Sequence, residues 1–398
     1  MRRLLLCLAA LAAVAPPPPP AGAAAQPTHA PALRPEDYRA DALSIAPLIE
    51  RVYAYPERFG GISPLSERLR GEAERVGDRR ALLLFAERAL LALADHHAIT
   101  GASFRDSRAV VPSFADLWIE RAGASYRITA VREGSPAESA GVRSGDALVA
   151  VEGLPIADAV VAFWADLGLA VTEERTAFAA RVLAAGRRDR PRRLAIRSAA
   201  GAERALDLPN LYSAAPPQRP PLAVREEAGA LVLRINDALG ESATIAAFDA
   251  AMAAAGPRRR IILDLRDTPS GGNTVVARAI LGWFVGRPAF YQVHRLPVEE
   301  RETGIPRQWA EQVLPRPGKR HRGPVTVLVG RWTGSMGEGL AIGFDAIGAE
   351  VCGGPMAGLL GAIYDYRLER SGLVLKLPTE RLYAVDGTPR EAFVPPRR

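Results

Sequence analysis

The first third of the chain carries apolar residues at the three- and four-residue spacing of a helix. Between residues 82 and 93, leucine, phenylalanine and alanine recur on one face. We expect helices from Pro35 to Ala94, within an N-terminal helical region that spans residues 37–111. A polar run, Asp95-His96-His97, follows the last of these helices.

A β-rich stretch comes next, in which apolar and polar residues alternate from Tyr126 to Val131. The run EGSPAESAGVRSGDALVAVEG, residues 133–153, then predicts a short capped helix followed by a strand. Gly141 and Gly145 stand where the chain must turn, and glycine can take the positive φ that such turns require. Two helical segments and a hairpin follow. We therefore expect a small β-rich domain over residues 112–212.

Beyond a proline-rich linker at 213–221, strands alternate with helices. Apolar runs predict the strands, and helical periodicity predicts the helices. The strands are expected at 230–235, 261–265 and 325–329, and the helices at 241–255, 274–285 and 335–347. Interleaving of this kind is typical of an α/β domain whose sheet is covered by helices. We place this domain at residues 222–398.

The N-terminus has the composition of a secretory signal peptide. Two arginines precede an apolar run from Leu4 to Ala15, and small residues end at Ala25. The run is too short to cross a bilayer as a helix, and no later segment is long and apolar enough. We expect a signal peptide at 1–25, a linker at 26–36, and a periplasmic or secreted protein without stable membrane insertion. The alternative is an alanine-rich tail with no targeting role.

Composition excludes several kinds of site. Once the signal peptide is removed, Cys352 would be the only cysteine, which excludes an internal disulfide and a cysteine-based zinc or iron–sulfur site. The formal charge of +7 comes mostly from scattered arginines. The longest basic runs, 258–260 and 319–322, precede apolar strands, and we interpret them as solvated turns. Because no aromatic residues are interleaved with them, we expect no nucleic-acid partner.

Two glycine-rich loops follow strands of the α/β domain, at residues 264–273 (DLRDTPSGGN) and 330–339 (GRWTGSMGEG). Strand ends of this kind are the usual place for a site in an α/β domain. Ser335 would project from a tight turn at a helix N-terminus, where free N–H groups and the helix dipole stabilise an oxyanion. The alternative is that Ser335 only caps the helix, because Ser335-x-x-Glu338 fits a capping box.

Together these segments resemble the carboxyl-terminal processing, or tail-specific, serine protease family, and in particular its tricorn-protease and retinoid-binding-protein-like branch. The matching pieces are DLR…GG at 264–272, TGSMGE at 333–338 and DGTPREAFVPP at 386–396. The run at 133–153 resembles a PDZ domain. The resemblance implies a ClpP/crotonase-like catalytic domain. It also implies an endopeptidase that cleaves peptides or unfolded or tagged proteins, without a cofactor or metal.

The resemblance also bears on the general base. Many members of the family use a lysine that follows the serine, but the corresponding segment here, 353–361, has leucine instead. Neither Lys319 nor Lys376 lies where that lysine is expected. The tricorn-like branch uses histidine, serine and glutamate in that chain order, which implies His97 as the base and Glu391 as the acid that orients it. The alternatives are a surface or core-capping role for His97 and a solvated turn for Glu391.

With these assignments, Ser335 would attack the scissile carbonyl while His97 takes its proton. The N–H groups of Met336 and of Gly271 or Gly272 would stabilise the oxyanion. Two non-catalytic functions remain as alternatives on the same fold: a binder of hydrophobic ligands, and an adaptor that binds through its PDZ domain. The order of histidine, serine and glutamate favours the peptidase.

Overall fold

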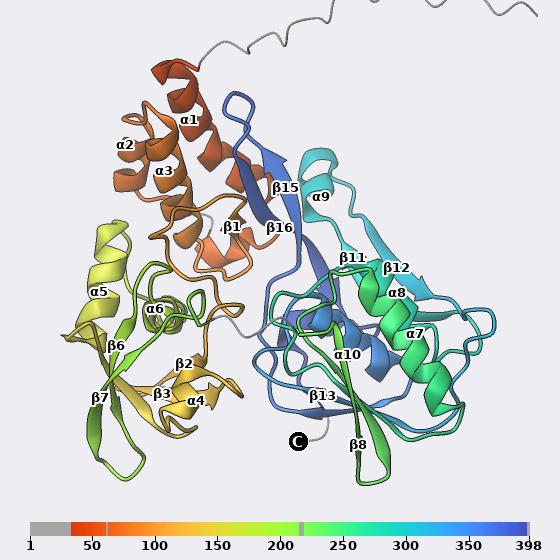
Figure 1. Ribbon diagram of the computed structural model, residues 1–398. Coiled ribbons are helices and arrows are strands. Elements are labelled where there is room, and N and C mark those ends of the chain that lie inside the picture. The colour runs from red at the N-terminus through yellow and green to blue at the C-terminus, as the bar shows by residue number, and fades with distance from the viewer. Residues whose placement is uncertain (1–32, 61–62, 215–218, 396–398) are drawn as a thin grey trace, which may run out of the picture. The chain divides into compact units, whose positions relative to one another are not determined.

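Three helices form the N-terminal part of the structure (Figure 1). They are α1 (Pro35–Val52), α2 (Glu67–Ala73) and α3 (Arg79–Leu91), with a 3-10 turn η1 at Pro56–Phe59. This computed structural model describes residues 33–60, 63–214 and 219–395. The predicted signal peptide, most of the linker at 26–36 and part of the linker at 213–221 therefore lie outside the described residues.

The ends of these helices follow from local chemistry. The side chains of Ser66 and Asp78 accept the N–H groups of Leu69 and Ala81, which fixes the first turns of α2 and α3. The apolar face predicted in the third helix is buried, as Leu82 and its neighbours on that face show. The helical region therefore has the structure expected from its periodicity.

A six-stranded sheet follows, with strand order β2-β3-β4-β6-β7 and β5 paired to β4. Its strands are β2 (Leu117–Ala122), β3 (Ser125–Val131), β4 (Ala147–Val151), β5 (Leu154–Pro155), β6 (Arg192–Arg197) and β7 (Glu203–Leu208). Its helices are α4 (Pro136–Ser139), α5 (Ile156–Asp166) and α6 (Glu173–Ala185). Gly141 and Gly145 have φ values of 78° and 98°, so both glycines occupy the turns predicted for them.

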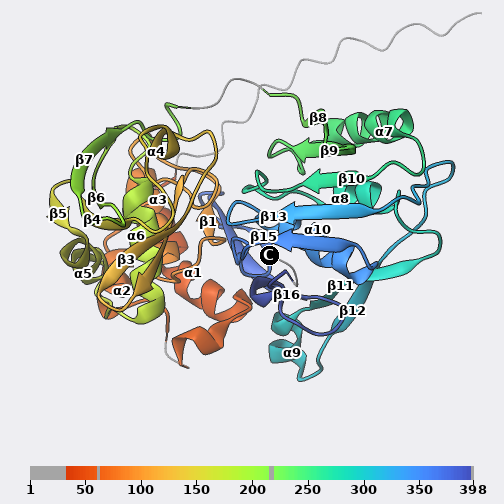
Figure 2. The same cartoon turned by 90° about the horizontal axis from the view of Figure 1, so that it is seen from below.

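The C-terminal part is built on a five-stranded sheet with the order β14-β13-β10-β9-β8. The strands are β8 (Leu222–Glu227), β9 (Ala230–Ile235), β10 (Ile261–Asp264), β13 (Val325–Val329) and β14 (Glu350–Gly353). Figure 2 shows β8, β9, β10 and β13 side by side in this order. Only β8 runs antiparallel to its neighbour; the other pairs are parallel. The parallel strands therefore end at one edge, where both glycine-rich loops begin.

Three helices pack on this sheet: α7 (Ala243–Ala255), α8 (Thr274–Leu281) and α10 (Met336–Ala346). Helix α8 contacts both α7 and α10, and these two contact the strands. The side chains of Leu233, Leu263 and Val327, on three adjacent strands, are fully buried. The α/β architecture predicted from the sequence is confirmed.

A second, antiparallel sheet has the order β1-β16-β11-β12, with β15 paired to β16. Its strands are β1 (Ile99–Thr100), β11 (Ala289–Arg295), β12 (Gln308–Val313), β15 (Ala362–Arg367) and β16 (Val374–Tyr383), accompanied by α9 (Pro297–Thr303) and a 3-10 turn η2 (Arg390–Ala392). Strands β15 and β16 form an antiparallel hairpin. The hairpin of β11 and β12 was not predicted.

Strand β1 joins the N-terminal helical region to the C-terminal domain. It begins two residues after His97, and Ile99 pairs with Lys376 of β16. Nearby, the Ala54 N–H donates to the Pro378 carbonyl at 2.9 Å. This pairing holds His97 next to the loop that precedes β15, although the two are more than 200 residues apart in sequence.

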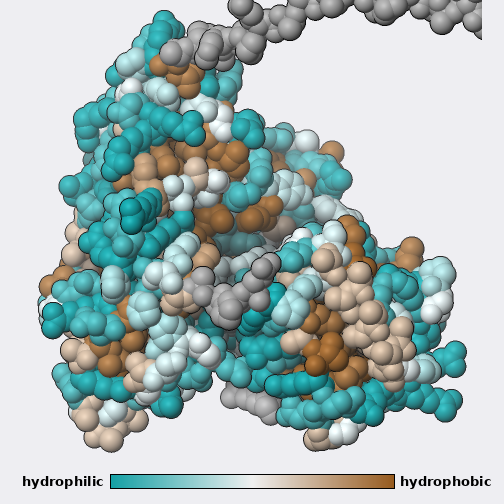
Figure 3. Space-filling model, viewed as in Figure 1, coloured by the Kyte–Doolittle hydropathy of each residue, from teal (hydrophilic) through white to brown (hydrophobic). Residues whose placement is uncertain are grey.

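The face shown in Figure 3 is largely hydrophilic, with apolar colour in separate areas. Large exposed apolar side chains occur on many elements, including Leu84, Val224 and Ile305. Scattered exposure of this kind is normal for a folded protein. Among the described residues, no helix combines the length and the apolar character that a membrane span needs.

Candidate active site

The two glycine-rich loops are hydrogen-bonded to each other. The Thr268 N–H donates to the Trp332 carbonyl at 2.9 Å, and the Gly334 N–H donates to the Thr268 carbonyl at 3.2 Å. The Thr333 hydroxyl donates to the Leu265 carbonyl at 2.9 Å. Both loops follow neighbouring parallel strands, β10 and β13. The site therefore rests on one fixed backbone framework.

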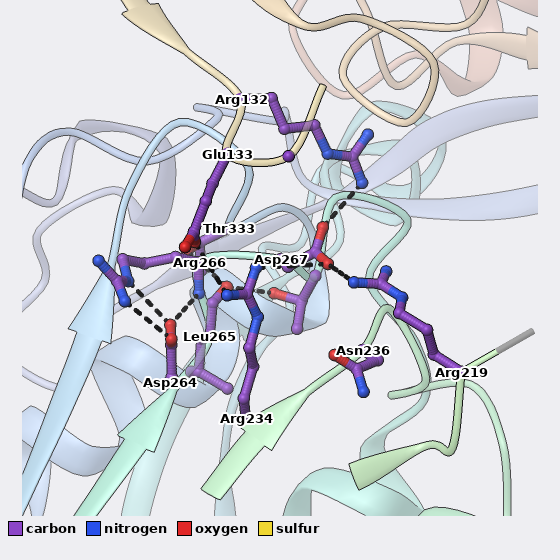
Figure 4. Close-up of polar contacts among 12 residues, drawn as sticks. Arg132, Glu133, Arg219, Arg234, Asn236, Asp264, Leu265, Arg266, Asp267 and Thr333 are labelled. Atoms are coloured by element: carbon purple, nitrogen blue, oxygen red, sulfur yellow. Dashed lines mark hydrogen bonds and ion pairs between the residues drawn. The ribbon is translucent and has the colours of Figure 1, made fainter. Parts of the chain in front are cut away.

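Arginine–carboxylate pairs brace the first loop (Figure 4). Arg266 makes two hydrogen bonds of 2.9 Å to Asp264, the last residue of β10. Asp267 pairs with Arg132 at 2.8 Å and with Arg219 at 2.7 Å. Burial alone would raise the pKa of Asp267, but these two guanidinium groups outweigh it and lower the pKa. Arg132 belongs to the β-rich domain, so this contact joins that domain to the loop.

The second loop also contacts the β-rich domain. The indole N–H of Trp332 donates to the Ala115 carbonyl at 2.8 Å. Arg331 pairs with Glu120 of β2, and its guanidinium lies 5.0 Å from the ring centre of Trp118. The residues immediately before Ser335 are therefore held by the edge strand of the neighbouring domain.

Ser335 has an unusual backbone conformation, with φ 50° and ψ −113°. The Gly337 N–H donates to the Gly334 carbonyl at 2.8 Å and closes a four-residue turn around Ser335. These dihedrals match the first central residue of a type II′ turn, a place that favours glycine. A serine held there stores roughly 1–3 kcal/mol of strain. The turn presents the half-buried side chain of Ser335 immediately before α10, at the N-terminus of the helix.

The first loop approaches Ser335 so closely that only glycine fits. A Cβ atom on Gly271 would overlap the Ser335 side chain and lie 3.0 Å from the Met336 nitrogen. A Cβ atom on Gly272 would lie 2.6 Å from the Gly240 nitrogen. Gly271 also has a φ of 68°, which glycine adopts without strain. The absence of side chains lets the backbone lie against Ser335 at Gly271 and against residues 239–240 at Gly272.

Not every predicted oxyanion donor is equally placed. The Gly271 N–H donates to the Thr268 carbonyl at 3.2 Å, so it already has an acceptor. Met336 is the first residue of α10, and the N–H groups of a first helical turn have no acceptor within the helix. Gly272 and Met336 are therefore the better candidates for this role.

Glu338 connects the turn at Ser335 to a third loop, residues 358–361. Its carboxylate accepts the N–H of Ser335 at 2.8 Å, of Gly358 at 2.8 Å and of Leu359 at 3.2 Å. Its side chain is fully buried. Burial raises the pKa of Glu338 to about 7, although Arg390 and the three N–H donors act against the rise.

His97 meets the same loop from the other side. Its Nδ1 atom lies 2.7 Å from the Leu360 carbonyl oxygen, and its backbone N–H donates to Asp95 at 2.8 Å. The side chain is 7% exposed. Burial lowers the pKa of His97 to about 4, and the positive charge of Arg390 adds to this effect. His97 and Ser335 thus contact one short segment, through Leu360 and Glu338 respectively.

Glu391 and His96 have different surroundings. The Glu391 Oε2 atom is buried and has no hydrogen-bond partner, and no bond joins it to His97 in the described part of the chain. The backbone carbonyl of Glu391 faces Gly358 of the same loop. His96 points away and stacks on Phe178, with ring centres 4.4 Å apart. Burial of the ring lowers the pKa of His96 well below its ordinary value, so His96 is an uncharged, half-buried residue.

A cavity of about 340 Å³ opens beside Ser335. Its lining includes His294, Glu311 and Glu380 from the second sheet. His294 stacks on Trp309, its Nδ1 contacts Glu380, and its Nε2 lies 3.2 Å from Glu311. Burial alone would lower the pKa of His294, but the two carboxylates raise it to about 9. His294 is therefore a cation at neutral pH.

Part of this site was not predicted from the sequence. No role was assigned to His294, and Glu338 was considered only as part of a capping box. One signal was available: Gln292 and His294 are polar residues on the same face of an otherwise apolar strand. The partners of His294 could not be inferred, because β16 and β12 bring Glu380 and Glu311 to it from distant parts of the chain.

Comparison with known proteins supports the fold. Residues 230–396 match peptidase family S41, and residues 127–161 match the PDZ domain. A photosystem II D1 C-terminal processing protease is 17% identical, with a TM-score of 0.56, over 91% of this chain and 93% of that one. Mature CPAF is 14% identical, with a TM-score of 0.57, over 91% and 92%. At such identities the likeness shows the fold alone. No curated protein matches the chain.

Proposed function

We propose that Ser335 is the nucleophile and His97 the general base of this chain, which belongs to peptidase family S41 and carries a PDZ domain. The chain is a serine-type peptidase, and its substrates are peptides or proteins. The observation that carries the proposal is the strained turn that presents Ser335 at the N-terminus of α10, against the Gly271-Gly272 backbone. A residue is held in such a conformation only where the surrounding structure imposes it, and this is common at active sites.

The chemistry follows from these placements. The Ser335 Oγ attacks the scissile carbonyl, and its proton passes to Nε2 of His97. The tetrahedral oxyanion accepts hydrogen bonds from the N–H groups of Met336 and Gly272. The protonated His97 then gives its proton to the leaving amine, which leaves an acyl-enzyme on Ser335. A water molecule, activated by the same histidine, hydrolyses the ester and restores the site.

Charge decides between His97 and His294 as the base. His294 lines the cavity beside Ser335, but with a pKa raised to about 9 it is protonated at pH 7 and cannot accept a proton. The pKa of His97 is lowered to about 4, so its imidazole is neutral at the same pH. A general base must be in its free form to act. His97 therefore fits the role and His294 does not.

The orientation of His97 is proposed to depend on two groups. Leu360 accepts the Nδ1 proton, which leaves the Nε2 lone pair available for Ser335. Glu391 remains the proposed acid of the site. Its Oε2 atom is buried and its backbone carbonyl faces Gly358 of the loop that carries Leu360, and its negative charge would stabilise the imidazolium formed during the reaction.

We also propose that the enzyme is exported and cleaves peptides or unfolded or tagged proteins as an endopeptidase. Export is supported by the order of basic, apolar and small residues at 1–25. N-terminal sequencing of the mature enzyme from the periplasmic or secreted fraction should give a start near Gln26. A protein that still begins at Met1 would contradict export and leave the catalytic proposal unaffected.

Hydrolysis of casein and of an internally quenched peptide tests the activity. The wild-type enzyme should cleave both, and Ser335→Ala should cleave neither while keeping its thermal unfolding temperature within a few degrees. Trp332→Phe serves as a control for loop damage, because it removes a hydrogen bond to the PDZ domain and some buried packing next to Ser335 but leaves the serine in place. Equal hydrolysis by wild type and Ser335→Ala would refute the proposal.

A further inference from the structure

We propose that Arg390 is a positioning residue of this active site, which holds the loop at residues 358–361 in the shape that orients His97. The inference rests on the function proposed above, in which His97 is the base. Arg390 is 2% exposed and lies in η2, next to Glu391 in the chain. It also lines the cavity beside Ser335.

Arg390 hydrogen-bonds to the two carbonyls on either side of the one that His97 contacts. The Nη2 group of Arg390 donates to the Leu359 carbonyl at 2.9 Å and to the Gly361 carbonyl at 2.7 Å. The carbonyl between these two, that of Leu360, accepts from Nδ1 of His97. One guanidinium therefore fixes the two peptide groups on either side of the acceptor.

Glu338 holds the same loop through its N–H groups. Its carboxylate accepts from Gly358 and Leu359, while Arg390 binds the carbonyls of Leu359 and Gly361. Gly361, at the end of the loop, packs so closely on the Glu380 carbonyl that a Cβ atom there would overlap it. The loop is thus held on both backbone faces. It links the turn at Ser335, through Glu338, to the imidazole of His97.

The positive charge of Arg390 acts on both Glu338 and His97. No ion pair joins Arg390 to a carboxylate within the described part of the chain, where most arginines of the catalytic domain have one. Burying a guanidinium without an ion-pair partner is costly, so a purely structural role would be better filled by an apolar side chain. The charge lowers the pKa of Glu338 and that of His97, which favours the ionised acid and the neutral base.

Other charged groups near these two residues do not replace Arg390. Asp95 accepts the backbone N–H of His97 and carries the opposite sign. Arg331 faces Glu338 from the loop before Ser335, but it is already paired with Glu120. Arg390 is the cation whose charge affects both Glu338 and His97.

The test compares three variants by pH–rate profile of kcat/KM and by thermal unfolding. Arg390→Met removes both the clamp and the charge. We expect kcat/KM to fall about 100-fold, as a displacement near 1 Å would cause, and the rising limb of the profile to move to higher pH. Arg390→Lys keeps the charge, but the lysine side chain is one bond shorter than the path to Nη2 and more flexible, so its ammonium group should hold the two carbonyls less firmly. We expect a smaller loss, with the limb unmoved.

Arg316→Met is the matched control. Arg316 is a half-buried arginine of the same domain that binds Asp249 and the Ala279 carbonyl, away from the loop. Arg316→Met should lower the unfolding temperature without moving the rising limb of the pH–rate profile. Guanidinium at millimolar concentration should partly restore a fourth variant, Arg390→Ala, and have no effect on Arg316→Met.

An Arg390→Met enzyme with wild-type kcat/KM and an unmoved limb would overturn the inference. If that variant does not fold, wild-type kcat/KM in Arg390→Lys would overturn the clamp. Ser335→Ala and His97→Ala are measured in parallel. Wild-type activity in Ser335→Ala and His97→Ala would refute the proposed function itself. If both are inactive while Arg390→Met keeps wild-type kcat/KM, only the role of Arg390 is refuted.

Discussion

The Nδ1 atom of His97 lies 2.7 Å from the carbonyl oxygen of Leu360. A carbonyl can only accept a hydrogen bond, so this contact places the proton on Nδ1 and leaves the lone pair on Nε2. In a serine triad a carboxylate usually accepts the Nδ1 proton. Here an uncharged backbone group does so, and the proposed acid, Glu391, has no bond to the ring. The Leu360 carbonyl thus sets the tautomer of His97, and Glu391 is the group proposed to stabilise the positive charge of its imidazolium.

This division predicts different effects for the residues around the base. His97→Ala should lower kcat/KM by about four to six orders of magnitude, as loss of a triad member does. Glu391→Gln should cost less, because Leu360 still fixes the tautomer. His96→Ala is the control: it removes packing against Phe178 and should lower stability more than activity. Steady-state kinetics on one peptide gives all three values, and a His97→Ala enzyme as active as His96→Ala would exclude His97 as the base.

The backbone conformation of Ser335 predicts a stability effect. Ser335→Gly should relieve roughly 1–3 kcal/mol of strain, offset by about 0.4–1 kcal/mol of added chain entropy in the unfolded state. We therefore expect it to be inactive yet about 1 kcal/mol more stable than Ser335→Ala, which keeps a Cβ atom. Urea unfolding of the two variants measures the difference. A less stable Ser335→Gly would mean that the turn is not strained.

Close packing at the first loop predicts that Gly271 cannot be changed. Gly271→Ala places a methyl group against Ser335 and should abolish activity. Gly354→Ala is a matched control, because a Cβ atom there meets nothing within 4 Å and the residue does not need a positive φ. Peptide hydrolysis by the two variants should therefore differ by at least about 100-fold. Equal activities would show that the Gly271 backbone does not contact the reacting group.

Two buried groups determine the pH dependence. The pKa of His97 is lowered to about 4, so the base is already neutral at pH 5, while the pKa of Glu338 is raised to about 7. Because Glu338 must be ionised to accept three N–H groups, kcat/KM should rise as the pH increases through about 7. Glu338→Gln should have lower activity and lack this rise. If kcat/KM of Glu338→Gln still rises through the same pH, a group other than Glu338 is responsible for the rise.

The same shifts have opposite effects on stability. The pKa of Glu338 is higher in the folded state than in the unfolded state, so its contribution to folding is lost as the pH rises from about 4.5 to 7. The pKa of His97 is lower in the folded state, so its contribution is lost as the pH falls from about 6.5 to 4. The two terms largely cancel near pH 5.5. Near pH 7 the Glu338 term is the larger, so the unfolding temperature should fall slightly while activity rises, and the opposite signs separate the kinetic limb from unfolding.

Local patterns in the sequence were sufficient for many of the elements and for the Ser335 loop. Helical periodicity predicted α3, alternation predicted β3, and an apolar run followed by glycines predicted the strand, turn and helix around Ser335. Contacts made over long distances were not predictable. His97 reaches Leu360 because β1 pairs with β16, and Arg390 reaches the same loop because the chain folds back after β16. No local pattern specifies such pairings, so the roles of Leu360 and Arg390 emerge only from the structure.

The central claim is that Ser335 forms a covalent acyl-enzyme. Treating the purified enzyme with a fluorophosphonate, followed by intact mass measurement and peptide mapping, tests it directly, because only an activated serine reacts readily. We expect one adduct per chain, located on Ser335, with labelling lost in His97→Ala. An enzyme that hydrolyses peptides while Ser335 stays unlabelled, or while the adduct maps to another serine, would contradict the account.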